Sequence, residues 1–395
     1  MKDWKQALQE ALPEAVAWRR ALHRVPELAF REVNTTAFIR RTLEDCGIEV
    51  LPQIMETGVV AVIRGALPGK TVMLREDIDA LPMGEETGLA FASETPGVCH
   101  SCGHDIHTSS LLLAGKVLQQ CREILPGAVV LVFQPAEETA SGAKAMLQAG
   151  LKDLYPDTAA VIGFHVAPQY PAGTVGLIKG PACASTDEVR VILRGEGGHG
   201  AHPYRCADTV AAAGYLLAEL QTLISRENPA VKPAVLTFGM IHGGSAPNAI
   251  PKEVELRGTL RAFHEDSRQN LWAGIRRVAR CCAEIHRATA EVTILEGVPV
   301  LCNDPAMTEG LAKAARDLYG PDSVIWEELP SPGSDDFSCF SAIAPGVQFR
   351  VGSGNDDPRS KLGLHCPETL FDEKAIEVGA AVMIGYLMQA VGGAR

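Results

Sequence analysis

The sequence predicts an α/β protein in which a mainly parallel sheet is interrupted by an inserted α+β domain. Helical and strand patterns alternate in the first 180 residues, a β-α-β-β-α-β order follows, and the alternating pattern then resumes. At 395 residues the chain is also too long for one compact core. We therefore expect one domain formed by residues 1–180 and 297–395, with a second domain inserted at residues 181–296.

In the first part, residues 31–47 have helical periodicity and end at a glycine. Strand patterns follow at 58–65, 70–77, 128–134 and 159–165, with a helical pattern at 107–121 between the second and third of these. Polar segments end three of the strands: "REDIDALP", "QPAEE" and "FHV". Because open parallel sheets bind ligands at the carboxyl ends of their strands, these segments are expected to form one site.

The inserted part has its own pattern. Strands are expected at 186–195, 234–244, 253–263 and 290–297, and helices at 206–225 and 266–287. This order is typical of a ferredoxin-like, split βαβ domain. A helix at 304–320, strands at 323–328 and 346–352 and a closing helix then continue the first domain.

Composition excludes several classes of protein. A net charge of -12 argues against nucleic acid as the main partner. No stretch approaches the roughly 20 apolar residues of a membrane span, and the first residues, "MKDWKQALQE", lack the apolar segment of a signal peptide. Eleven cysteines without framework spacing indicate reduced thiols. These features predict a cytoplasmic enzyme.

Side chains that bind metals fall at the predicted strand ends and loops. They are Cys102 and His104 before a helix, Glu137 and Glu138 after one strand, His165 at the end of another, and His365 near the C-terminus. Thiolate, imidazole and carboxylate together suit zinc, manganese, cobalt or nickel rather than calcium or magnesium. Of two adjacent glutamates, one can bind metal while the other acts as a general base.

Cys99 and Cys102 also form a C-x-x-C pair, which is typical of redox sites. The strand and helix pattern of a thioredoxin-like fold is missing around it, so metal binding is the preferred interpretation. Cys99 could still compete for metal or form a disulfide with Cys102. His107 is expected to cap or pack in the first turn of the following helix rather than to bind metal.

Nine segments together resemble one known family. They are "REDIDALP", "CGHDIHT", "QPAEE", "GFHV", "GGHGAHP", "GGSAPNAIP", "GTLRAF", "SDDFS" and "LHCPE", in this order across nearly the whole chain. The chain resembles the metal-dependent aminoacylase and carboxypeptidase superfamily. The similar branch contains hippurate hydrolases, N-acyl-amino-acid amidohydrolases and plant auxin-conjugate hydrolases.

The resemblance implies a role for each motif residue of the metallohydrolase domain. A centre of two divalent transition-metal ions (Mn, Zn, Co or Ni) would be bound by Cys102, His104, Glu138, His165 and His365. Glu137 would be the general base. Asp77 and Asp79 are placed in the layer of residues behind the ligands.

The resemblance also implies that the inserted domain is a lid and dimerisation domain, in a homodimer or higher homo-oligomer. His199 would reach a neighbouring subunit's site and stabilise the oxyanion there. Asn248 and Arg261 would hold the carboxylate of the substrate, for which the planar fork of arginine is well suited.

The expected reaction is hydrolysis of the amide bond of N-acyl-L-amino acids, such as hippurate or N-acetyl-amino acids, to a carboxylic acid and a free amino acid. Two alternatives use the same site: a dipeptidase or carboxypeptidase, and a deacetylase of N-acetyl-diaminopimelate. A third, of another class, is a non-catalytic metal- or ligand-binding homologue. Glu137 argues against it, because a protein that only binds has no need of a general base.

Overall fold

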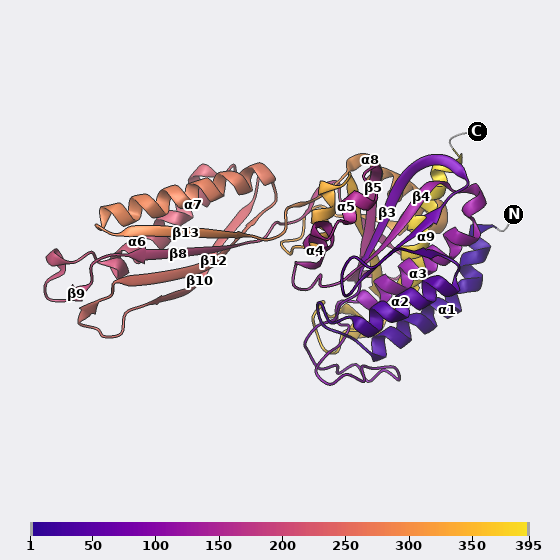
Figure 1. Cartoon of the computed structure of the whole chain (residues 1–395), viewed down its shortest axis with the longest axis horizontal. Helices are drawn as coiled ribbons and strands as arrows, with labels where there is room; N and C mark the ends of the chain where they lie inside the picture. Colours follow the sequence, from indigo (N-terminus) through magenta and orange to yellow (C-terminus); the bar gives the residue numbers. More distant parts are fainter. Residues whose placement is uncertain (1–2, 393–395) are drawn as a thin grey trace. The chain divides into compact units, whose positions relative to one another are not determined.

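The computed structural model describes residues 3–392 and divides them into two compact units. Unit 1 extends to Gly180 and includes Cys302–Leu329 and the described chain from Asp335 onward. Unit 2 consists of Pro181–Leu301 and Pro330–Ser334. Figure 1 shows the elements of both units along the chain.

An eight-stranded mixed sheet forms the centre of unit 1, in the order β1-β2-β4-β3-β5-β16-β6-β15. Its strands are β1 (Glu49–Val50), β2 (Val59–Arg64), β3 (Leu67–Asp77), β4 (Pro126–Gln134), β5 (Thr158–Pro171), β6 (Val175–Leu177), β15 (Val324–Trp326) and β16 (Gly346–Gly354). The central strands β4, β3, β5 and β16 pair in parallel. Their apolar runs are buried because helices and loops cover such a sheet on both faces. The predicted mainly parallel sheet is confirmed.

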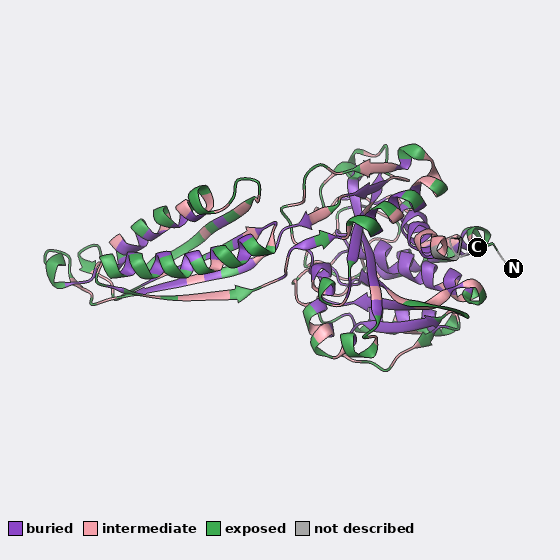
Figure 2. Ribbon diagram, turned by 90° about the horizontal axis from the view of Figure 1, so that it is seen from above, coloured by how far each residue is buried: buried purple, intermediate pink, exposed green. Residues whose placement is uncertain are grey.

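Seven α-helices belong to the described part of unit 1. They are α1 (Trp4–Arg24), α2 (Val33–Asp45), α3 (His104–Gln120), α4 (Gly142–Gln148), α5 (Leu151–Leu154), α8 (Pro305–Tyr319) and α9 (Lys374–Gly392). Helix α3 contacts α1, α9 and β3 and is buried over most of its length. Figure 2 shows that buried residues gather in the strands and inner helices of unit 1. Gly115 permits close packing of α3 on β4, since a Cβ there would lie 2.7 Å from the Leu131 side chain. Across residues 3–392, no helix has both the length and the apolar character needed to cross a bilayer.

Unit 2 contains a four-stranded antiparallel sheet in the order β10-β12-β8-β13. Its elements are β8 (Asp187–Arg194), α6 (Thr209–Thr222), β10 (Ala234–Gly243), β12 (Glu253–Ala262), α7 (Glu265–Ile285) and β13 (Thr289–Glu296). Apolar side chains of both helices form one core with the sheet. A short ribbon, β9 (Gly198–His199) with β11 (Ala249–Ile250), is also part of this unit, and β7 (Gly180–Cys183) and β14 (Leu301–Asn303) lie where the chain passes between the units. The role of unit 2 as a lid or dimerisation domain stays a prediction.

Candidate metal centre

The candidate site lies at the carboxyl edge of the parallel strands of unit 1. Strand β3 ends at Asp77, and β4 ends at Gln134, its partner in the register. His165 lies on β5, on the other side of β3. Helix α3 begins at His104, whose ring approaches Asp77 to 3.6 Å. Parallel pairing therefore gathers segments that are far apart in the sequence at one edge of the sheet.

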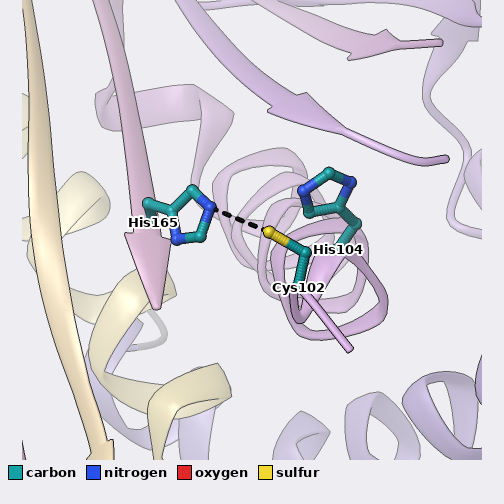
Figure 3. Close-up of side chains that lie close together, drawn as sticks. All are labelled: Cys102, His104 and His165. Atoms are coloured by element: carbon teal, nitrogen blue, oxygen red, sulfur yellow. Dashed lines mark hydrogen bonds between the residues drawn. The ribbon is translucent and has the colours of Figure 1, made fainter. Parts of the chain in front are cut away.

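The five side chains predicted as metal ligands lie together in overlapping groups. In each group one ligand atom per residue lies within 4.8 Å of the others: Cys102, His104 and His165 form one group, and Cys102, Glu138 and His365 form another. Figure 3 shows the Cys102 thiol between the two imidazoles of the first group. The Cys102 Sγ lies 3.4 Å from His165 Nε2, and Glu138 Oε2 lies 3.4 Å from His365 Nε2.

Two of these ligand atoms are buried without a hydrogen bond. His104 Nε2 and Glu138 Oε1 are 3.8 Å apart, and neither has a hydrogen-bond partner among residues 3–392. An unpartnered buried polar atom carries a desolvation cost of about 1–3 kcal/mol, so such atoms are rare unless a ligand satisfies them. The residues present therefore fit a divalent transition metal, which accepts nitrogen, sulfur and carboxylate donors at tetrahedral or five-coordinate sites.

The two buried histidines are oriented to offer their Nε2 atoms. His165 Nδ1 lies 2.8 Å from its hydrogen-bond acceptor, the carbonyl of Val166, and His104 Nδ1 lies 3.2 Å from Asp79 Oδ1. A hydrogen bond from Nδ1 places the lone pair on Nε2, where a metal can accept it. Burial also holds the pKa of His165 well below its usual range, so the ring is neutral.

Cys102 and His365 come from separate loops that are tied to each other. The backbone N–H of His365 donates to the carbonyl of Ser101 at 3.1 Å, which places the ring beside the loop of Cys102. Burial raises the pKa of the Cys102 thiol well above its usual range. Metal ligands must be deprotonated, so binding of a cation here would release the thiol proton.

Glu137 lies beside the ligand groups and belongs to an acidic cluster. Glu137 has an oxygen within 4.8 Å of candidate ligand atoms of His104 and Glu138. In a second group it has an oxygen within the same distance of carboxylate oxygens of Asp335 and Asp336. Burial, followed by the charges of Asp335 and Asp336, raises the pKa of Glu137 well above its usual range. A carboxylate with a raised pKa next to a metal site is suited to accept a proton.

Asp79 joins His104, one of the predicted ligands, to the two glutamates. Its Oδ1 accepts from the backbone N–H of Glu137 at 3.1 Å in addition to His104 Nδ1, and its Oδ2 accepts from the backbone N–H of Glu138 at 3.1 Å. One buried carboxylate thus orients the His104 ring and the loop that carries two acidic side chains. Such outer partners commonly control metal affinity.

Asp77 orients a histidine that is not among the predicted ligands. His107 Nδ1 lies 2.6 Å from Asp77 Oδ1, and its Nε2 accepts from the backbone N–H of Val166 at 3.0 Å. Both ring nitrogens are therefore occupied, and His107 packs inside the unit. Asp77 also pairs with Arg75 at 3.0 Å, and Arg75 in turn pairs with Asp336 at 2.7 Å.

Sequence reasoning assigned no role to Arg75 or Asp336. Both lie in segments, "REDIDALP" and "SDDFS", that were noted for their likeness to the family. Arg75 stands two residues before Asp77, and the two-residue period of a strand places both side chains on one face. That period was the available signal for Arg75, whereas the pairing with Asp336 spans 261 residues and has no local signal.

Cys99 does not form a disulfide with Cys102. Both are free thiols, and Cys99 is buried in a loop that pairs with the backbone of Leu81. In the part of the chain that the structure describes, no group of metal-capable side chains includes Cys99.

The remaining predicted site residues belong to unit 2. His199 is exposed on β9, opposite Ala249 of β11, and Gly200 donates to the carbonyl of Asn248 at 2.7 Å. The His199 Nδ1 accepts from the backbone N–H of Ala201 at 3.0 Å, so the ring proton is on Nε2, which is free to donate. His199 and Asn248 therefore lie side by side.

Arg261 lies elsewhere in unit 2. It is next to the last residue of β12, and its Nη1 donates to the carbonyl of Pro332 at 3.1 Å. Asn248 precedes the other end of this ten-residue strand. At about 3.4 Å per residue the two lie roughly 30 Å apart along β12. The structure does not bring Asn248 and Arg261 together within one chain.

Comparison with known proteins agrees with this geometry. A family model described as peptidase family M20/M25/M40 matches residues 73–389. The chain is 38% identical over 364 residues to an N-acetylcysteine deacetylase of Bacillus subtilis, covering 92% of this chain and 93% of the relative. It is 34% identical over 386 residues to thermostable carboxypeptidase 1 of Saccharolobus solfataricus, covering 96% of each.

A solved structure is similar over nearly the whole chain. It is described as a dinuclear metal-binding peptidase of the M20 family from Bacillus subtilis, with a TM-score of 0.84, 34% identity, and coverage of 97% of this chain and 99% of that one. The donor groups at the sheet edge are those that such a metal centre needs. The chain therefore belongs to peptidase family M20/M25/M40 and is a metal-dependent hydrolase of amide bonds.

Proposed function

We propose that the protein hydrolyses N-acyl-L-amino acids to a carboxylic acid and a free amino acid. The observation that carries the proposal is the position of Glu137, a buried side chain that has a carboxylate oxygen within 4.8 Å of the candidate ligand atoms of His104 and Glu138. The Bacillus subtilis relative named for N-acetylcysteine deacetylation supports an acyl amino acid as substrate.

The proposed ligands are Cys102, His104, Glu138, His165 and His365, with Asp77 and Asp79 behind them. When bound there, two divalent cations supply Lewis acidity to the attacking water and to the amide carbonyl. Glu137 takes the proton of the water and later delivers it to the leaving nitrogen.

Unit 2 would supply the groups that recognise the substrate. The exposed Nε2–H of His199 donates to the developing oxyanion; loss of one such donor typically lowers the rate about 100- to 1000-fold. Arg261 and Asn248 hold the carboxylate of the amino acid. Because these two residues lie at opposite ends of β12, we infer that they reach the same substrate carboxylate only when they come from two different subunits.

A carboxypeptidase is the second candidate, since the Saccharolobus relative with that name covers 96% of the chain. The test is hydrolysis of a panel of N-acetyl- and N-benzoyl-amino acids, dipeptides and N-acetyl-diaminopimelate by protein reconstituted with Mn, Zn, Co or Ni. We expect the N-acyl amino acids to be the best substrates and Glu137→Gln to abolish turnover with unchanged metal content. Faster cleavage of dipeptides would favour the second candidate, and no cleavage by fully loaded protein would refute both.

A further inference from the structure

Glu32 is a buried carboxyl group for which the proposed reaction has no use. It precedes α2 but does not cap that helix with its side chain. Instead Glu32 Oε1 accepts two backbone hydrogen bonds, from Phe30 at 3.0 Å and from Ala136 at 2.9 Å. The second joins Glu32 to the loop that carries Glu137 and Glu138, 104 residues away in sequence.

Both N–H donors belong to residues in a left-handed conformation. Phe30 has φ 59° and Ala136 has φ 57°. For a residue with a Cβ, this conformation costs roughly 1–2 kcal/mol. It persists where the surroundings determine it, and it is common in loops that carry functional groups. One carboxylate oxygen therefore binds and stabilises two strained turns.

The loop from Ala136 to Glu138 is held through three consecutive N–H groups. Glu32 accepts from Ala136, whereas Asp79 accepts from Glu137 and Glu138. On the other side, the carbonyl of Ala136 accepts from the backbone N–H of Gly142 at 3.1 Å, which closes the loop on itself. Ala136 is thus fixed on both sides, immediately before the two glutamates.

We propose that Glu32 is a positioning residue, which directs Glu137 and Glu138 into the metal centre by holding the N–H of Ala136. The role of the loop in catalysis rests on the function proposed above. Burial, with a contribution from the charge of Asp79, raises the pKa of Glu32 to about 7, even though its contacts with Thr57 and with backbone N–H groups act to lower it. An apolar side chain would fill the same space without this cost, so the acceptor itself is what the position requires.

Three variants test the proposal. Glu32→Leu removes the acceptor, whereas Glu32→Gln keeps an oxygen that can accept from both N–H groups. Glu27→Leu is the matched control, because the Glu27 carboxylate also accepts backbone N–H groups, from Asn34 and Thr35, but does not touch the loop. If Glu32→Leu does not fold, Glu32→Asp replaces it, since its shorter carboxylate cannot reach both donors.

The first readouts need no substrate. In the metal-free protein we expect Glu32→Leu to accelerate amide hydrogen exchange in residues 134–142 at least tenfold, and Glu27→Leu to accelerate it only near the start of α2. We also expect Glu32→Leu to weaken the Kd for Zn²⁺ or Mn²⁺ about 10- to 100-fold, with Glu32→Gln within about threefold of wild type. Equal exchange and affinity in Glu32→Leu and Glu27→Leu would overturn the proposal.

Kinetics at saturating metal provide the second readout. We expect Glu32→Leu to lower kcat at least tenfold with KM within about twofold, because the loop carries the base and not the substrate-binding groups. A kcat as low in Glu32→Gln as in Glu32→Leu would overturn the role of the acceptor. If wild type hydrolyses no substrate, the proposed function fails, whereas the exchange and affinity measurements still decide the role of Glu32.

Discussion

Replacement of Asp79 by asparagine tests how far residues behind the ligands control the metal centre. Asp79 accepts three hydrogen bonds, from His104 Nδ1, Glu137 N and Glu138 N. An asparagine has the same shape but only one oxygen. In its better orientation the oxygen accepts from His104 and Glu137, and the amide nitrogen then faces the N–H of Glu138, donor against donor.

The expected change in the metal Kd follows from the number of hydrogen bonds that the asparagine loses. One hydrogen bond to a charged acceptor is lost, which contributes about 1.5–3 kcal/mol. Since about 1.4 kcal/mol corresponds to a tenfold change in a binding constant, we expect the metal Kd of Asp79→Asn to rise about 10- to 100-fold. The remaining hydrogen bonds keep the loop folded, so the change in affinity exceeds the change in the free energy of unfolding.

The assay is competition for Zn²⁺ or Mn²⁺ between the metal-free protein and a chelating indicator. Asp304→Ala serves as control, because Asp304 also accepts two backbone N–H groups, from Ala306 and Met307, but at the start of α8. It should cost about 1 kcal/mol in the free energy of unfolding and leave the metal Kd unchanged. A Kd for Asp79→Asn within twofold of wild type would refute the reasoning.

Three further predictions concern the partner subunit, pH and unit 2. If His199 acts across the dimer, a heterodimer of a His199→Ala chain and a Glu137→Gln chain has one complete site of two and should recover up to about half of wild-type activity. Inactive heterodimers of verified composition would show that His199 does not act across the dimer. Because the pKa of Glu32 is raised, the folded state binds the carboxyl proton more tightly than the unfolded state does. The resulting contribution to stability is present below about pH 4.5 and is lost as pH rises to about 7. In urea unfolding, metal-free Glu32→Gln should therefore gain stability relative to wild type between pH 5 and pH 7.5, and a constant difference would contradict this. Arg268→Met should lower the free energy of unfolding of unit 2 by about 3–5 kcal/mol in the same assay, because it leaves the buried Asp187 carboxylate without its cation. In the wild type, Arg268 Nε and Nη2 donate to Asp187 Oδ2 and Oδ1 at 2.9 and 2.6 Å. A loss below about 1 kcal/mol would be inconsistent with a buried ion pair.

The gathering of donor groups at one edge of the sheet could be predicted from local patterns. Strand periodicity correctly placed Asp77 at the end of β3. It also predicted that a strand ends at His165, whereas β5 continues to Pro171. The parallel arrangement of the two strands still brings both residues to one edge of the sheet. The thiol of Cys102 and the imidazole of His104 indicate metal binding from their donor atoms alone, without reference to any tertiary contact. The comparisons confirm the family. The five side chains expected as ligands lie together in overlapping groups, and their role as ligands stays a prediction.

The contacts that hold these donors had no local signal. Glu32 meets Ala136 across 104 residues, and Arg75 meets Asp336 across 261. The strand period places Arg75 on the same face as Asp77, but nothing near Glu32 or Arg75 in the sequence indicates these distant partners. Burial of both groups is a consequence of the assembled core, and periodicity within one strand or helix does not report it.

In unit 2 too, the elements could be predicted from the sequence, whereas the distance between two site residues could not. Its order of strands and helices followed from periodicity, and the strands and helices occur in that order. Periodicity did not predict the distance between Asn248 and Arg261, which are both expected to bind one substrate carboxylate. Only the register of β12, with Glu253 opposite Arg194 and Leu260 opposite Asp187, shows that a whole strand separates them.

By itself, the sequence determined the class of chemistry and the type of sheet, because donor atoms are properties of residue types and strand periodicity is a property of neighbouring residues. Only the tertiary structure decided which nitrogen of His104 faces Glu138, which carboxylates hold Ala136 and Glu137, and which acidic groups surround the proposed base. Hydrogen bonds and pKa shifts depend on atoms a few ångströms apart in space, and folding brings those atoms together from segments that are distant in the sequence.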